Sequence, residues 1–132
     1  IGKIGISDSI LNKPGVLSGE EFEIVKKHPA IGESIVADLG LSHEERAIIR
    51  HHHERWDGKG YPDGLGGKDI PLLARIVSVA DAFDAMTSMR AYRDAVSRSE
   101  SIAELTKGSG KQFDPGAVDA FMEFMDQKNS KI

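Results

Sequence analysis

The chain has 132 residues, of which 39% are apolar, and this size and composition suit one ordinary globular domain. Its 17 basic and 21 acidic residues give a net charge of −4, which argues against a long nucleic acid as the main partner because such proteins present a basic face. The absence of cysteine excludes disulfides and leaves nitrogen and oxygen as metal ligands, and without a signal peptide or a membrane span we expect a cytoplasmic domain.

The first third of the chain should contain two helical segments after a glycine-punctuated opening. Residues 1–16 read as a loop or a brief helix. A helix should then start at Ser18, because Glu21 stands three residues later and the two can form a capping box. Pro29 disturbs this helix, and a helical pattern then resumes until Gly40, a favoured stop residue.

The middle of the chain should contain a capped helix and the longest helix. Ser42 and Glu45 form a second capping box, which opens the helix that ends in "RHHHE". The run 71–88 carries apolar residues on all sides, as does a helix buried at the centre of a bundle.

The last third should add two more helices. Ser97 and Glu100 repeat the capping box, and Asp114 before Pro115 is an N-cap followed by proline at the first helical position. We found no pair of strands that could form a sheet. The sequence therefore predicts an all-α fold, a single helical bundle of about five or six helices.

Three consecutive histidines, His51, His52 and His53, stand at the end of the helix that starts at Ser42. Adjacent residues on a helix point about 100° apart, so one ion would not take two of them from mid-helix. At a helix end, or around two ions, adjacent ligands become feasible. A solvated, histidine-rich terminus that favours the helix dipole is the structural alternative. Three consecutive histidines followed by a glycine-rich loop favour the interpretation as metal ligands over that alternative.

Asp81 lies in the middle of the most apolar helix. An ionised carboxylate in such a position is costly unless it is paired or binds a metal. Arg75 and Arg90 are candidate partners. From position alone, an ion pair and a metal ligand both remain open.

The loop 57–67, "DGKGYPDGLGG", can turn tightly and approach a ligand or a partner. Tyr61 and Pro62 give it a rigid aromatic point. The loop does not follow the P-loop pattern, so its glycines alone are weak evidence for a phosphate site.

Arg90 and Arg93 are three residues apart and would share one face of a helix. Paired guanidinium groups suit bidentate phosphate contacts. They suit surface salt bridges with Asp94 or Glu100 equally well, and the spacing by itself favours the salt bridges.

Along almost its whole length the sequence resembles the HD-GYP family, bacterial metal-dependent phosphodiesterases of the HD superfamily. The resemblance rests on motifs spread over the chain: "GKIGI" at 2–6, "KKHPAIG" at 26–32, "HHERWDGKGYPDGL" at 52–65, "IPLLARIVSVADAFDAMTS", "RAYR" and "FDPGAVDAF". The HHE-x-x-DG-x-GYP block is highly specific for this family.

The resemblance implies a function and a ligand set. Family members hydrolyse cyclic di-GMP or related cyclic dinucleotides, to linear pGpG or GMP, with a cluster of two or three metal ions, often iron or manganese. The matching metal-ligand positions are His28, His52, His53 and Asp81. His51 is not expected to be a ligand.

The resemblance also implies contacts to substrate and partner. Lys3 matches a lysine close to the scissile phosphate, and Arg90 and Arg93 match cationic positions that resemble phosphate clamps. Tyr61 lies in the GYP loop, which this family associates with ligand contact and with docking of GGDEF cyclases.

The family's HD dyad should directly precede "IGK", and a helix with further Glu and His ligands should precede the dyad. The resemblance therefore implies that residues 1–132 are the C-terminal portion of an HD-GYP domain, truncated just after the dyad, in a parent that carries an upstream sensory or receiver domain. We expect the 132 residues alone to show no more than trace turnover. The alternative is a non-catalytic signalling module that binds cyclic di-GMP or a GGDEF partner.

Overall fold

The computed structural model describes residues 2–88 and 94–131, and the regular elements in these ranges are helices joined by loops. Two 3₁₀ helices are η1 (Gly2–Gly5) and η2 (Gly67–Asp69). The α-helices in the described ranges are α1 (Asp8–Leu11), α2 (Gly19–Val25), α3 (His28–Val36), α4 (His43–His51), α5 (Leu72–Thr87), α6 (Arg98–Gly108) and α7 (Pro115–Asn129). The described ranges contain no β-strand, only an isolated bridge between Ser109 and Phe113. The predicted all-α class is confirmed, with six helices of at least seven residues and the single turn α1.

The predicted helix starts are confirmed in atomic detail. Ser18, Ser42 and Ser97 each form both hydrogen bonds of a capping box with the glutamate three residues on. The Asp114 carboxylate accepts the backbone N–H of Gly116 at 2.9 Å and starts α7. These bonds satisfy amide groups that a helix start otherwise leaves unpaired, so each start follows from its local sequence.

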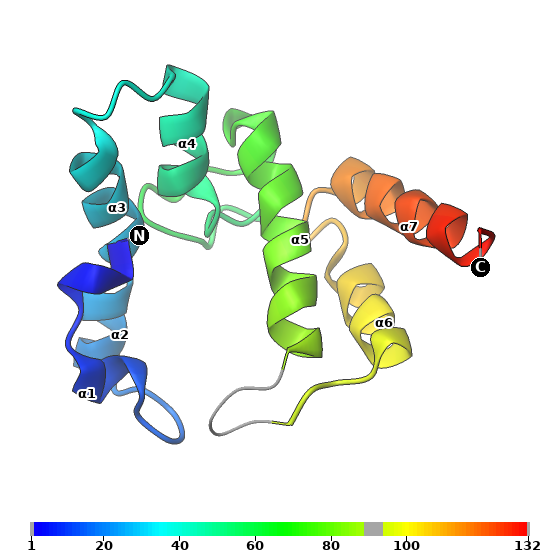
Figure 1. The fold of residues 1–132 in the computed structure, drawn as a ribbon, viewed down its shortest axis with the longest axis horizontal. Coiled ribbons are helices and arrows are strands. Elements are labelled where there is room, and N and C mark those ends of the chain that lie inside the picture. Colours follow the sequence, from blue (N-terminus) through cyan, green and yellow to red (C-terminus); the bar gives the residue numbers. More distant parts are fainter. Residues whose placement is uncertain (1, 89–93, 132) are drawn as a thin grey trace.

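Helix α5 lies between the two halves of the chain (Figure 1). Helices α1–α4 lie on one side of it, and α6 and α7 on the other. Helix α5 contacts α4, α6 and α7, while α3 packs against α4 and η1. A buried hydrophobic cluster joins α5 to α6, α7 and the segment between them, through Val79, Leu105, Phe113, Ala117 and Val118. None of the described helices has the length and apolar character needed to cross a membrane.

The expectation that α5 is buried on every side is wrong. Leu72, Leu73 and Ile76 are 56%, 44% and 46% exposed, and only Ala74 and Val79 of this helix are buried. The physical reason is that its neighbours in the described residues cover only part of its circumference. The central position of α5 is nevertheless the one expected.

Helix η1 lies directly on the first turn of α3. A Cβ at Gly2 would collide with the backbone carbonyl of His28, so only glycine allows this approach. The close packing brings Lys3 of η1 to the same end of α3 as His28.

Candidate metal centre

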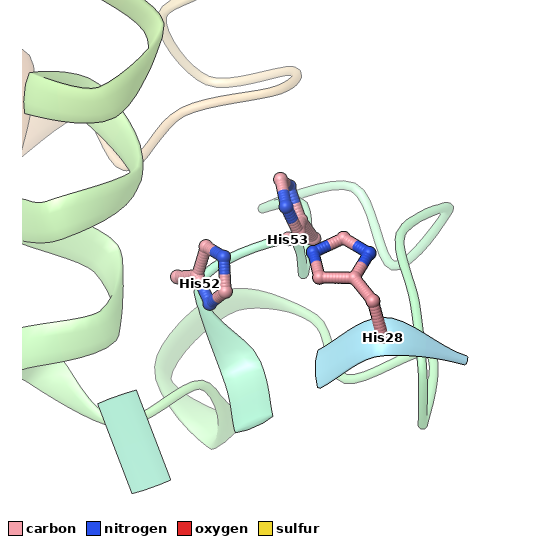
Figure 2. A group of neighbouring side chains, drawn as sticks. All are labelled: His28, His52 and His53. Atoms are coloured by element: carbon pink, nitrogen blue, oxygen red, sulfur yellow. The ribbon is translucent and has the colours of Figure 1, made fainter. Parts of the chain in front are cut away.

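Three imidazole rings meet where α3 begins and α4 ends (Figure 2). His28 is the first residue of α3, His52 is the C-cap of α4 and His53 follows it. One ring nitrogen from each lies within 4.8 Å of the other two. Adjacent histidines can converge here because α4 ends at His51, so the backbone of His53 no longer follows the helix.

Two of these rings have a fixed orientation. His28 Nδ1 lies 2.6 Å from the carbonyl oxygen of Val25, and His52 Nδ1 lies 2.9 Å from that of Ile49. Since a carbonyl oxygen only accepts hydrogen bonds, Nδ1 carries the proton and donates in both cases. In the neutral ring this leaves the lone pair on Nε2, the arrangement usual for metal-binding histidines, whose other nitrogen donates to a backbone carbonyl.

Two of the rings, those of His28 and His53, are held in the neutral form. Burial lowers the pKa of His28, and the neighbouring His52 and Lys3 charges lower it further against the hydrogen bond to Val25. Burial, followed by the charges of His52, His28 and Lys3, lowers the pKa of His53 to about 3. Neutral imidazole is the form that binds a metal ion, so neither ring has to lose a proton at neutral pH.

A cavity of about 530 Å³ opens beside the three histidines. It is lined by Lys3 from η1 and Asp81 from α5 as well as by the three rings, and apolar walls come from α4 and α5. The structure thus brings together five of the eight residues expected from the sequence: Lys3, His28, His52, His53 and Asp81. Tyr61 lies beside them, while Arg90 and Arg93 are outside the described residues.

Asp81 faces solvent at this cavity, and is not enclosed in the apolar core as its place in the sequence suggested. Arg75, one of its two candidate partners, instead pairs with Asp114, with 2.6 Å between Nη1 and Oδ2, and donates to the carbonyl of Ile70. Arg90, the other candidate, lies outside the described residues. The Asp81 carboxylate adds to the effect of burial in raising the pKa of Tyr61, which places its charge near that ring.

Tyr61 lies against the histidines. Its ring stacks on that of His53, with centroids 5.1 Å apart and planes 26° apart. It also meets the edges of His28 and Phe22 at 6.4 Å and 6.0 Å. The GYP loop thus supports the ring of His53.

Glu54 is a residue whose role the sequence did not reveal. Its side chain is fully buried, and its two oxygens accept the backbone N–H groups of Asp63 at 2.7 Å and Leu65 at 3.0 Å. The chain between Glu54 and Leu65 therefore closes on itself. Gly60 is required inside this turn, because a Cβ there would lie 2.5 Å from the backbone nitrogen of Arg55 and from the carbonyl oxygen of His53. The only signal in the sequence was the presence of Glu54 within the HHE block.

A family model described as "HD domain" matches residues 1–117. The chain belongs to the HD domain family. Among its curated relatives, a cyclic di-GMP phosphodiesterase of Vibrio cholerae is 45% identical over 129 residues, and one of Thermotoga maritima is 48% identical over 128. These matches cover 92% and 93% of this chain but only 26% and 34% of the relatives. This HD domain chain thus spans about a quarter to a third of their length.

Two solved structures resemble this HD domain. The crystal structure of a V. cholerae phosphodiesterase specific for cyclic GMP-AMP has a TM-score of 0.70 and 22% identity, over 96% of this chain and 33% of that one. An HDG"Y"P protein from Bdellovibrio bacteriovorus has a TM-score of 0.70 and 27% identity, over 95% of this chain and 40% of that one. Among the curated relatives, a second V. cholerae protein, 40% identical, is named as a phosphodiesterase specific for 3'3'-cGAMP.

The residues of the cavity fit a divalent metal ion of the kind that HD domains bind. Two imidazoles are oriented by bonds from Nδ1 to backbone carbonyls, the pKa values of His28 and His53 are lowered, and a carboxylate lines the same cavity. Nitrogen ligands with a carboxylate suit iron, manganese or zinc better than magnesium or calcium, which prefer oxygen alone.

Proposed function

We propose that this HD domain is the metal-dependent phosphodiesterase portion of a protein that hydrolyses cyclic di-GMP to linear pGpG or GMP. The observation that carries the proposal is the group of three converging imidazoles, two of them with lowered pKa values, which lines one cavity together with Lys3 and Asp81. The names of the relatives support a cyclic dinucleotide as the substrate class.

In this proposal His28, His52, His53 and Asp81 hold divalent ions, of which iron or manganese are the proposed identities. When bound, such ions lower the pKa of a coordinated water and polarise phosphoryl oxygens. The hydrogen bonds of His28 and His52 to backbone carbonyls hold both rings in the tautomer that leaves Nε2 free.

The proposed phosphate contacts come from Lys3, Arg90 and Arg93. Lys3 lines the cavity because η1 packs against α3, and in this proposal its ammonium group stabilises negative charge on phosphoryl oxygens. Tyr61 supports the ring of His53 by stacking on it. Arg90 and Arg93 complete the proposed phosphate contacts. A cavity of about 530 Å³ lies in the range of small-ligand sites.

A GGDEF-domain protein is the proposed macromolecular partner of the GYP loop. Tyr61 itself is half-buried against His53, so a partner would meet the exposed residues of the loop, Asp57, Lys59 and Asp63, rather than the tyrosine ring. An upstream sensory or receiver domain in the same protein remains part of the proposal.

The experiment that tests the function grafts residues 1–132 in place of the matching segment of the T. maritima relative, since this chain covers only part of that protein. We expect the chimera to convert cyclic di-GMP to pGpG or GMP with added Mn²⁺ or Fe²⁺, and His53→Ala to abolish turnover. His43→Ala is the matched control, because His43 is an exposed histidine at the far end of α4.

The 132 residues alone are expected to bind metal with no more than trace turnover, because the described cavity offers a single carboxylate, too few ligands for a bridged pair of ions. A folded chimera that binds cyclic di-GMP without hydrolysing it would favour the non-catalytic module. Turnover unchanged by His53→Ala would contradict the proposed site.

A further inference from the structure

A second group of metal-capable side chains lies at the junction of α4 with the loop that carries Tyr61. It consists of His51, Glu54 and Asp63, hereafter the His51 cluster, whose ligand atoms lie within 4.8 Å of one another. His51 Nδ1 is buried and has no hydrogen-bond partner among the described residues. A buried polar nitrogen without a partner is unfavourable, so something that the described residues do not supply should satisfy it.

The distances within the cluster are those of ligands around an ion rather than of hydrogen bonds. His51 Nδ1 lies 3.5 Å from Asp63 Oδ2 and 3.7 Å from Glu54 Oε1. Both separations exceed the ordinary N–H···O range of about 2.7–3.2 Å. Two ligands bound tetrahedrally at about 2.1 Å from a common ion are about 3.4 Å apart, which is close to the observed values.

Both carboxylates are oriented by other hydrogen bonds. Glu54 accepts two backbone N–H groups of the loop, and Asp63 accepts Nε and Nη2 of Arg50 at 2.8 Å and 2.9 Å. Each carboxylate oxygen has a second lone pair and keeps it free for a metal. Carboxylates that bind metals are commonly held by such outer hydrogen bonds.

The charged groups around the cluster carry an excess of negative charge, which favours a bound cation. Arg50 also pairs with Glu33, and Arg46 pairs with the same glutamate. Three carboxylates, those of Glu33, Glu54 and Asp63, therefore face two guanidinium groups, so Arg50 does not neutralise the cluster. Access exists as well, because the Asp63 side chain is 35% exposed and a cavity of about 220 Å³ reaches His51.

We infer that His51, Glu54 and Asp63 bind one divalent transition-metal ion at a site separate from the His28, His52 and His53 group. The ion would link the last turn of α4 to the loop that carries Tyr61. Since His51 directly precedes His52 and Glu54 follows His53, an ion here would hold both ends of the segment that supplies two ligands of the first site. One imidazole nitrogen and two carboxylates suit Zn²⁺, with water as the fourth ligand.

The test is a Zn²⁺ titration of the metal-free chain by isothermal calorimetry, with stoichiometry checked by native mass spectrometry. In a His28→Gln/His53→Gln background, which loses two of the three imidazoles of the first site, we expect one equivalent to remain. Adding His51→Gln or Asp63→Asn should weaken this binding by more than the about 10- to 100-fold that loss of an outer hydrogen-bond partner costs. Adding Glu104→Gln, an exposed carboxylate of α6 outside both groups and outside this cavity, should leave it unchanged.

A second measurement covers the case in which the background unfolds. In the otherwise unaltered chain, Zn²⁺ should slow hydrogen exchange of the Asp63 and Leu65 amides, and His51→Gln should lower the stoichiometry by one. Equal Zn²⁺ binding with and without His51→Gln, or no binding in a folded background, would overturn the inference and leave the cluster as an ion pair of a protonated His51. Failure of the first site would be seen separately, as binding unaffected by His28→Gln/His53→Gln.

Discussion

The phenol ring of Tyr61 stacks on the imidazole of His53, with ring centroids 5.1 Å apart and planes 26° apart. The residues are eight positions apart, and the backbone N–H of Tyr61 also donates to the carbonyl of His53 at 3.3 Å. The GYP loop and the end of α4 are thus one structural unit, so a change in the loop should reach the proposed metal ligand directly.

Replacing Tyr61 should separate the role of its ring from that of its hydroxyl group. Tyr61→Ala removes the stack and leaves a gap beside His53, and we expect a loss of about 2 kcal/mol in the free energy of unfolding, less than for a fully buried aromatic residue. Metal affinity should fall with it. Tyr61→Phe keeps the ring and should retain both properties. Urea unfolding and Mn²⁺ titration measure the two effects, and equal behaviour of the two variants would argue against a supporting role for the ring.

Glu54→Gln should loosen the loop. The buried carboxylate accepts two backbone N–H groups, whereas a glutamine offers one oxygen and brings an NH₂ group toward a second N–H. We expect the free energy of unfolding to fall by about 2–3 kcal/mol and hydrogen exchange at the Asp63 and Leu65 amides to become faster. Glu104→Gln, at an exposed position of α6, is the control, and its free energy of unfolding should stay within about 0.5 kcal/mol of that of the unaltered chain.

The Glu33 carboxylate should contribute acid-sensitive stability between α3 and α4. Hydrogen bonds from Arg46 at 2.8 Å and Arg50 at 3.1 Å lower the pKa of Glu33 against the opposing effect of burial. A lowered folded-state pKa means that this stability is fully present above the unfolded value of about 4.3 and is lost as pH falls through the folded value.

Glu33→Gln should therefore lower the free energy of unfolding by about 1 kcal/mol at pH 7, and by less in high salt. It should also make the fall in melting temperature with acid less steep below about pH 4.3. Thermal unfolding from pH 7 to pH 2.5 measures this. Glu44→Gln, an exposed residue of the first turn of α4, is the comparison. An equally steep acid decline in Glu33→Gln and the unaltered chain would remove Glu33 as the source.

Gly60→Ala should distort the segment next to His53. The added Cβ would press on the backbone of Arg55, His53 and Glu54, atoms that do not move as a flexible side chain does. We expect the free energy of unfolding to fall by about 1–3 kcal/mol and Mn²⁺ binding to weaken. Gly19→Ala adds the same methyl group in open space at the start of α2 and should be neutral or slightly stabilising. Similar effects of the two variants would show that the close approach at Gly60 is not required.

The helix starts were predictable because each depends on residues close together in the chain. In all three capping boxes the serine and glutamate are three residues apart, so both hydrogen bonds form within the first turn of the helix and need no distant partner. The interruption at Pro29 follows the same logic, since α2 ends at Val25 and α3 begins at His28. The sequence by itself thus determined the helical class, the order of the helices and most of their starts.

The surroundings of the side chains were decided by how the helices pack. Asp81 faces solvent because α4, α6 and α7 leave part of α5 uncovered, which no periodicity within 71–88 reveals. Arg75 finds Asp114, 39 residues later, instead of Asp81. Family resemblance named His28, His52, His53 and Asp81 as ligands without indicating their geometry.

The amino-acid sequence alone determined which groups with metal-binding or phosphate-binding chemistry are present, and on which helices they lie, because residue type and local spacing set both. Only the tertiary structure decided that η1 rests on α3 beside His28, that Glu54 holds the loop through the Asp63 and Leu65 amides, and that His51 faces two carboxylates. These relationships depend on the distance and angle between elements. Packing of several elements at once sets those quantities, and no short stretch of sequence contains them.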